Sequence, residues 1–326
     1  MTARRVAMED ILCPTDFSEF SERALRHAAA LALHFGARLR VLHVMTPMPV
    51  YESDTLHPAA TPIVVEEKPS ELANERLRAF VAPCQGSAID LSLEVREGEP
   101  WREICKEAET LPADMLVIGT HGRGGFERFL LGSVAEKVLR RVACPVMSVC
   151  HEEGRTWEAP GLVSRIVCAI DLKESSTRTI EFALAMAAEK EARVTFLHVV
   201  EQMPTVISGG DYPFAVPNAK QLTEDAVAMA ERQLHSALPR EARKEKEMRE
   251  RIETGRAHEK ILEVAAAERA DLIVIGSRDH GALERLVSES TLQHVVRAAT
   301  CPVLTVRPSA RPAPRAGVEL VQVTRA

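Results

Sequence analysis

The feature that most constrains the fold is a long internal repeat. The segment that begins at Gly119 recurs at Gly276, which is 276 − 119 = 157 residues later, and 11 of its 31 positions are identical. An earlier segment, which begins at Ile11, recurs at Ile166 with a shift of 155 residues. A period of this length matches a whole domain and is far longer than the repeats of solenoid proteins. The sequence therefore predicts two tandem copies of one domain.

The length and composition agree with this organisation. We place the first domain at residues 1–150, a linker at 151–160, the second domain at 161–307 and a tail rich in Pro, Ala and Arg at 308–326. Each domain is long enough to bury a core of its own. Apolar residues make up 46% of the chain and charged residues 27%, which is ordinary for a globular protein.

Charge and cysteine usage narrow the classes of function. The net charge of −6 argues against broad binding to nucleic acid or to an anionic membrane. The amino-terminal segment is polar and lacks a signal-peptide core, and no apolar run is long enough to span a bilayer, so we expect a cytoplasmic protein. Cys13, Cys144, Cys168 and Cys301 lie in or beside predicted strands, which favours small buried thiols over a disulfide framework.

Apolar runs alternate with amphipathic segments along both copies. The predicted strands of the first copy are 11–13, 39–44, 89–95, 115–118 and 146–149, and those of the second are 165–170, 193–200, 248–252, 272–275 and 303–306. Helices are expected at about 18–34, ending at Gly36, and at about 69–81, 101–109 and 131–142. This alternation is typical of a doubly wound, Rossmann-like α/β domain with a five-stranded parallel sheet.

Three residues follow strand ends where such sheets bind ligands. Asp16, Val44 and Gly119 stand at the carboxyl ends of the first, second and fourth predicted strands. A glycine-rich loop follows Gly119, and Gly132-Ser133 opens the next helix. Bare backbone N–H groups and the positive end of a helix favour an anion, so the first copy is predicted to bind one.

The combined motifs resemble the ATP-binding signature of the universal stress proteins. The carriers of the resemblance are Gly-x-x-Gly-x9-Gly-Ser from Gly119, the later Cys144-Pro-Val, the strand end Pro14-Thr-Asp and the strand end Leu42-His-Val. The resemblance covers nearly the whole chain as two copies. It implies an adenine-nucleotide-binding fold of the alpha-hydrolase-like type, a role in stress tolerance, and ATP or AMP as ligand together with a divalent cation such as Mg²⁺.

The resemblance also implies roles for individual residues. Asp16 would lie by the nucleoside, Val44 would meet the adenine, and Gly119, Gly122, Gly132 and Ser133 would hold the phosphates. The candidate site further includes Thr15, His121, Arg123 and Val134. For His121, contact with a phosphate and simple exposure to solvent are equally plausible.

The second copy departs from the motif at two glycines. Asp279 stands where the first copy has Gly122, and Glu289 stands where it has Gly132. A carboxylate about 4 Å from a phosphate costs on the order of 4 kcal/mol, enough to turn a micromolar site into a millimolar one. We therefore expect that the second copy does not bind ATP. The alternative is that Arg278 neutralises an acid and a divalent ion bridges the rest.

Three kinds of function remain open from the sequence. A nucleotide-binding regulator is favoured, because no catalytic motif or metal-ligand spacing is present. A slow ATPase or an ATP-using transferase is the main alternative, and a scaffold without a ligand is the third. Ser208-Gly-Gly-Asp is interpreted as a plain loop, and His43 and His198 as core histidines bonded to backbone.

The sequence also suggests how the two copies assemble. Strands 146–149 and 303–306 are apolar and end their domains, so an unpaired edge there would promote aggregation. We expect the copies to meet through these strands as a pseudo-dimer within one chain. Dimerisation of whole chains and the identity of any protein partner stay open.

Overall fold

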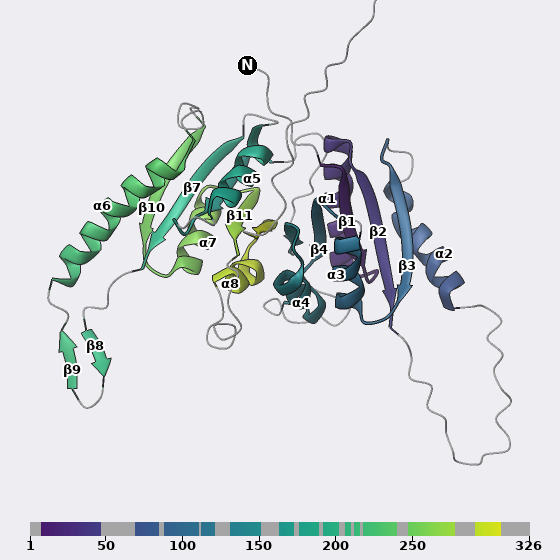
Figure 1. The fold of residues 1–326 in the computed structure, drawn as a ribbon, viewed down its shortest axis with the longest axis horizontal. Helices are drawn as coiled ribbons and strands as arrows, with labels where there is room; N and C mark the ends of the chain where they lie inside the picture. Colours follow the sequence, from purple (N-terminus) through teal and green to yellow (C-terminus); the bar gives the residue numbers. More distant parts are fainter. Residues whose placement is uncertain are drawn as a thin grey trace, which may run out of the picture.

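The structure is a computed structural model in which two domains of the same architecture lie side by side (Figure 1). It describes residues 8–46, 69–84, 88–110, 112–120, 131–150, 163–172, 176–188, 192–201, 206–209, 212–215, 218–239, 247–277 and 291–307.

The first domain contains five strands and four α-helices among these residues. Its strands are β1 (Asp10–Thr15), β2 (Arg38–Met45), β3 (Leu91–Glu97), β4 (Met115–Gly119) and β5 (Val146–Val149). Its helices are α1 (Glu19–Phe35), α2 (Pro69–Val81), α3 (Pro100–Thr110) and α4 (Ser133–Arg141), with a short 3₁₀ turn, η1 (Ala82–Cys84), after α2.

The second domain repeats this order and adds a two-stranded sheet. Its main strands are β6 (Arg165–Ala169), β7 (Arg193–Val200), β10 (Met248–Thr254), β11 (Leu272–Gly276) and β12 (Val303–Val306). Its helices are α5 (Ser176–Ala188), α6 (Ala219–Ala237), α7 (Ala257–Ala267) and α8 (Thr291–Ala298). The strands β8 (Val206–Gly209) and β9 (Tyr212–Ala215) pair antiparallel with each other.

The strand order places a reversal at the centre of each domain. The ten main strands form one sheet in the order β10-β7-β6-β11-β12-β5-β4-β1-β2-β3. In this sheet all pairs within one domain are parallel, and the chain moves outward first to one side of β1 or β6 and then to the other. This is the doubly wound topology, so the predicted fold class is confirmed.

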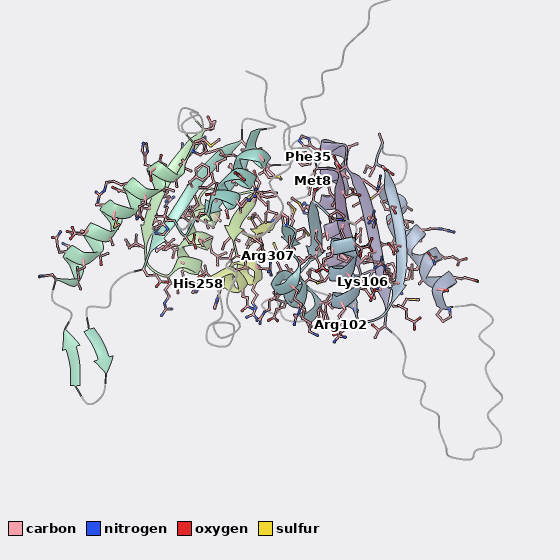
Figure 2. All side chains as sticks on the ribbon, viewed as in Figure 1. Met8, Phe35, Arg102, Lys106, His258 and Arg307 are labelled. Atoms are coloured by element: carbon pink, nitrogen blue, oxygen red, sulfur yellow. The ribbon has the colours of Figure 1, made fainter. Side chains whose placement is uncertain are left out.

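The two domains share one sheet through an antiparallel pair, as the sequence predicted. Strands β5 and β12 pair with Met147 opposite Leu304, which continues the sheet across the domain boundary. Among the described residues, three further hydrogen bonds cross the boundary. Arg307 Nη2 donates to the carbonyl of Leu139 at 2.7 Å, Cys150 Sγ donates to the carbonyl of Cys301 at 3.3 Å, and Gln293 Nε2 donates to Glu136 Oε1 at 3.4 Å. Figure 2 shows Arg307 between the two halves of the molecule.

Two apolar layers cover the faces of the sheet. One layer packs α1 and α5 on the sheet through residues such as Leu25, Leu31 and Phe182. The other packs α3, α4, α7 and α8 on the opposite face through residues such as Val138 and Val295. Helix α1 is capped by Ser18, whose hydroxyl accepts from Ser21 N, and it ends at Gly36 in the left-handed conformation.

A buried carboxylate ties α3 to the sheet in the first domain. The Glu107 side chain is fully buried, and it forms ion pairs with Arg40 of β2 at 2.7 Å and with Arg96 of β3. In the second domain Glu268 follows α7 and plays the corresponding part with Thr195 Oγ1 at 2.6 Å and Arg251 at 3.3 Å. A buried charge of this kind must be paired, because an unpaired one would be strongly destabilising.

The helix pairs α3–α4 and α7–α8 use different aromatic contacts at matching positions. Trp101 lies under Arg141, whose guanidinium carbon is 4.4 Å from the ring centroid, and under Lys137 at 5.6 Å. Residues 101 and 137 correspond, at the shift of 157, to His258 and His294, whose rings stack with centroids 4.3 Å apart. A cation–π contact in one domain is thus replaced by a ring stack in the other.

One sequence interpretation is wrong and one falls outside the described residues. The segment Ser208-Gly209, interpreted as a plain loop, ends strand β8, whose Gly209 is opposite Tyr212 of β9. The two residues between these strands are the usual length of a hairpin connection, and β-branched residues precede the glycine. The predicted edge strand at 318–323 lies outside the described residues. Among the residues that are described, no helix combines the length and apolar character needed to cross a bilayer.

Candidate functional site

The turn from β1 into α1 is built from consecutive polar or strained residues. Thr15 is buried, and its hydroxyl accepts from Phe17 N and donates to Ser21 Oγ, both at 3.0 Å. The half-exposed Asp16 follows, and its Oδ1 accepts from Ser18 N at 3.0 Å. Phe17 has φ of 63°, a left-handed conformation that is uncommon for a residue other than glycine. The turn therefore holds Asp16 in a fixed place just beyond the sheet.

His43 supports the same turn from the neighbouring strand. Its Nδ1 lies 2.8 Å from the carbonyl of Thr15, and its ring lies 4.2 Å from the ring of Phe17. A carbonyl only accepts, so Nδ1 carries the proton in this bond. His198 makes the matching bond to the carbonyl of Ile170 at 2.7 Å in the second domain. The predicted bond of each histidine to backbone is confirmed, and both side chains are half-buried.

Gly119 ends β4 at a point where α1 comes very close. A Cβ built on Gly119 would lie 2.9 Å from the backbone carbon and oxygen of Phe20. Such a contact is too short for any side chain, so glycine allows the first turn of α1 to pack on the end of β4. Glycine is therefore needed at position 119 for the packing of α1 on β4. The sequence had suggested a different reason for this glycine, namely the close approach of a phosphate.

A hydrogen bond between Thr120 and Gly132 fixes the start of α4. Gly132 N donates to the carbonyl of Thr120 at 2.7 Å, while Thr120 N donates to the carbonyl of Val149 at 3.0 Å. Gly132 is the N-cap residue and provides no side-chain cap, and the exposed Ser133 is the first helical residue. The amide groups of the first turn of α4 therefore start next to the carboxyl end of β4.

The strand registers bring the candidate residues level with one another. Thr15 pairs with His43, so the next residues along, Asp16 and Val44, lie level on neighbouring strands. Strand β1 pairs with β4 at Ile11–Met115, and this register continued upward brings Thr15 level with Gly119. Asp16, Val44 and Gly119 thus share one edge of the sheet at the strand reversal, as expected.

The remaining candidates divide between the described residues and the rest. Val44 is 9% exposed and joins the apolar layer on the α3–α4 face, and the half-buried Val134 packs against that layer. His121, Gly122 and Arg123 lie outside the described residues.

The second domain has the same backbone turn with a different polar arrangement. Leu172, which corresponds to Phe17, has φ of 57°. The carboxylate of Asp171, which corresponds to Asp16, accepts from Ser176 Oγ at 2.5 Å. A Cβ on Gly276 would meet Thr179 Oγ1 at 2.8 Å, a side-chain atom in place of backbone. Asp279 and Glu289 lie outside the described residues.

Two buried polar residues of the first domain were missed from the sequence. Thr120 is buried and ties the two ends of the glycine loop, and its only sequence signal is a hydroxyl that recurs as Ser277 in the second copy. His27 on α1 is 5% exposed, and burial, aided by the charge of Arg26, lowers the pKa of His27 to about 4. His27 corresponds to the buried Phe182 at the shift of 155. The helical pattern places both residues on the buried face of their helices, so it did not reveal that one of them is titratable.

The cysteines agree with the prediction of reduced, mostly buried thiols. All seven are free, with Cys13, Cys168 and Cys301 buried and Cys144 partly buried. Burial raises the pKa of the Cys13 and Cys168 thiols far above the usual range. These thiols are therefore protonated and unreactive, which leaves them a packing role.

The fold and the strand-end residues define an α/β protein with two tandem, doubly wound domains and a glycine-loop edge in the first. A sequence profile of the universal stress protein family matches residues 8–149 and again residues 163–307. The chain therefore belongs to the universal stress protein family and carries two tandem copies of its domain.

Individual relatives agree with this assignment. The chain is 28% identical to a universal stress protein of Mycolicibacterium smegmatis over 300 residues, which cover 91% of this chain and 97% of that protein. It is 34% identical to a universal stress protein of Methanocaldococcus jannaschii over 139 residues, 43% of this chain and 80% of the relative. The crystal structure of a universal stress protein from Archaeoglobus fulgidus has the same fold, with a TM-score of 0.63 and 24% identity over 93% of this chain and 97% of that one.

Proposed function

We propose that the first domain binds ATP at the carboxyl ends of β1, β2 and β4, and that the chain acts as a nucleotide-dependent regulator of a stress response. The observation that carries this proposal is the strand reversal between β1 and β4. It brings Asp16, Val44 and the start of α4 to one edge of the sheet, at the glycine-loop motif.

Each described residue suits one part of the nucleotide. The Asp16 carboxylate, held by its bond from Ser18 N, can accept a ribose hydroxyl. Val44 offers an apolar edge and its backbone to the adenine. The first backbone N–H groups of α4 and the hydroxyl of the exposed Ser133 can donate hydrogen bonds to the phosphates. Thr15 acts through the turn, since its hydroxyl and carbonyl are both bonded within the protein.

The loop residues and the cation complete the proposed site. His121, Gly122 and Arg123 would contact the phosphates, and Val134 would pack behind them. Mg²⁺ usually keeps several waters and binds through phosphates and one or two protein oxygens, so the Ser133 hydroxyl would supply the protein oxygen. The cation would neutralise phosphate charge. AMP would use the same nucleoside contacts with fewer phosphate contacts.

The proposal assigns no ATP binding to the second domain. Asp279 and Glu289 bring negative charge to the positions of Gly122 and Gly132. The Asp171 carboxylate is also engaged by the Ser176 hydroxyl, which would compete with a ribose hydroxyl. The second domain then serves as the pseudo-symmetric support of the first through β5 and β12. The protein would act in the cytoplasm on a protein partner.

Calorimetric titration of the whole chain with ATP and with AMP in the presence of Mg²⁺ tests this function. We expect one site per chain, weakened by Asp16→Asn and unchanged by the matched Asp171→Asn. Two equivalent sites would disprove the asymmetry, and no heat with either nucleotide would favour a scaffold. ATP turnover that Asp16→Asn abolishes while binding remains would favour the enzyme.

A further inference from the structure

Helix α6 presents apolar side chains to solvent along half of its length. It is the longest helix in the part of the chain that the structure describes, with 19 residues, and it lies at the outer end of the second domain (Figure 1). Only Ala219, Ala230 and Leu234 are buried among its residues. The contacts of the helix with β7 and β10 therefore use one narrow face.

The exposed apolar residues form a stripe next to that face. Leu222 is 44% exposed and Met229 is 54% exposed, and the exposed Ala226 lies between them at helical spacing. Positions 222, 226 and 229 follow the i, i+4, i+7 pattern that places side chains on one side of a helix. These three residues are the outer stripe of α6. An apolar stripe of this kind is what a second helix packs against.

Two opposite charges beside the outer stripe would pair between two copies of α6 that lie antiparallel. Asp225 and Arg232 are both exposed and flank the stripe on the same side. They are seven residues apart, about 10 Å along the axis, so they do not pair within one helix. If a second α6 lies antiparallel with Ala226 level with Met229, then Asp225 is level with residue 230 of the second helix. Arg232 of the second helix is two residues beyond its residue 230, so it lies only about 3 Å along the axis from Asp225 of the first helix.

We propose that the outer stripe of α6 is a homodimer interface, in which two copies of the chain pair their α6 helices antiparallel. Two equivalent Asp225–Arg232 ion pairs flank the Leu222, Ala226 and Met229 contacts. This arrangement is isologous, so it closes as a dimer and leaves β5 and β12 in their pairing within each chain. A helix of this length buries less area than a standard interface, so the dimer is weak and depends on concentration.

Sedimentation velocity of the full-length chain over a range of concentrations tests the apolar part. We expect Leu222→Glu and Met229→Glu each to raise the dimer dissociation constant by at least roughly tenfold. The matched controls are Leu33→Glu on α1 and Leu72→Glu on α2, where the leucines are 44% and 56% exposed. Both controls should dimerise like the parent chain. A parent chain that is monomeric throughout, or controls that weaken the dimer equally, would overturn the proposal.

Charge reversal tests the orientation and does not depend on the apolar variants folding. Asp225→Arg and Arg232→Asp should each weaken the dimer several-fold, because each places like charges opposite one another twice. The double variant restores both pairs and should dimerise like the parent chain. A double variant that is weaker than both single variants would overturn the antiparallel arrangement, with circular dichroism confirming that every variant stays helical.

Discussion

The two domains share the contacts that build the fold and differ in the contacts that would meet a ligand. Both have a left-handed residue after the first strand, Phe17 or Leu172, and both have a histidine bonded to the preceding carbonyl. The acid at the turn accepts a backbone N–H in the first domain and the Ser176 hydroxyl in the second. The comparison separates the requirements of the fold from those of the ligand within one chain.

The largest expected effect comes from copying the acids of the second domain into the first. The variant Gly122→Asp, Gly132→Glu should lose ATP affinity by at least roughly a thousandfold, because even one carboxylate beside a phosphate costs on the order of 4 kcal/mol. Calorimetry with ATP and a melting curve with and without ATP would measure it.

The control for that variant makes the reciprocal change. Asp279→Gly, Glu289→Gly removes the acids of the second domain and should leave the first site as it is. If the Gly122→Asp, Gly132→Glu chain keeps the ATP affinity of the parent, and unfolds like the parent without ligand, the assignment of the loop to phosphate is rejected.

The next effect is a difference in acid stability between the two cores. The pKa of His27 is lowered from 6.5 to about 4, so the folded state resists the proton that the unfolded state takes up. Stability of the first domain should therefore fall as the pH decreases from about 6.5 to about 4, by about 3 kcal/mol in total. His27→Phe, which copies Phe182, should remove this loss.

Urea unfolding of the parent chain and of His27→Phe across this pH range would measure the effect. The matched variant Phe182→His should introduce the same sensitivity into the second domain. Identical pH dependence of the parent and of His27→Phe would mean that another group controls acid unfolding.

A smaller difference is expected between the two strand-end glycines. Gly119→Ala places a Cβ against the backbone of Phe20 and should destabilise the first domain by about 2 kcal/mol. Gly276→Ala meets Thr179 Oγ1, which can rotate away, so its cost should be under about 1 kcal/mol. Chemical denaturation of both variants compares them directly, and equal costs would show that α1 shifts as easily as the threonine.

The smallest effect concerns the contacts between neighbouring helices. Arg141→Gln removes the cation over Trp101 and should destabilise the first domain by about 0.5–1 kcal/mol. A double-mutant cycle with Trp101→Leu isolates the pair from other losses. No coupling between the two substitutions would show that Arg141 only covers the ring.

The sequence predicted the order of elements because hydrophobic periodicity and caps are local signals. Residues 146–149 and 303–306 were predicted as strands with the bounds that the structure has, and their pairing followed from two apolar edges. Asp16, Val44 and Gly119 were placed correctly at one edge because parallel strands end together.

Other features depend on contacts between distant segments. Glu107 belongs to a charged, amphipathic helix, and only the positions of Arg40 and Arg96 on two strands make its burial possible. The close approach of Phe20 to Gly119 depends on how α1 packs, which no motif encodes. The hairpin of β8 and β9 was missed because Ser, Gly and Asp are typical loop residues, and only Val206 and Ile207 before them carry a strand signal.

Because β5 and β12 pair antiparallel, the carboxyl-end edges of the two domains face opposite ends of the sheet. The main-sheet strands of one domain run opposite to those of the other, so the carboxyl ends of the first set lie at the same edge of the sheet as the amino ends of the second. A protein bound over Asp16 and Gly119 would therefore lie beside the amino ends of the strands of the second domain. It would not reach Asp171 and Gly276, which lie at the opposite edge of the sheet. The candidate edges of the two domains therefore lie at opposite ends of the sheet, and a partner bound at one end would contact the candidate edge of one domain only.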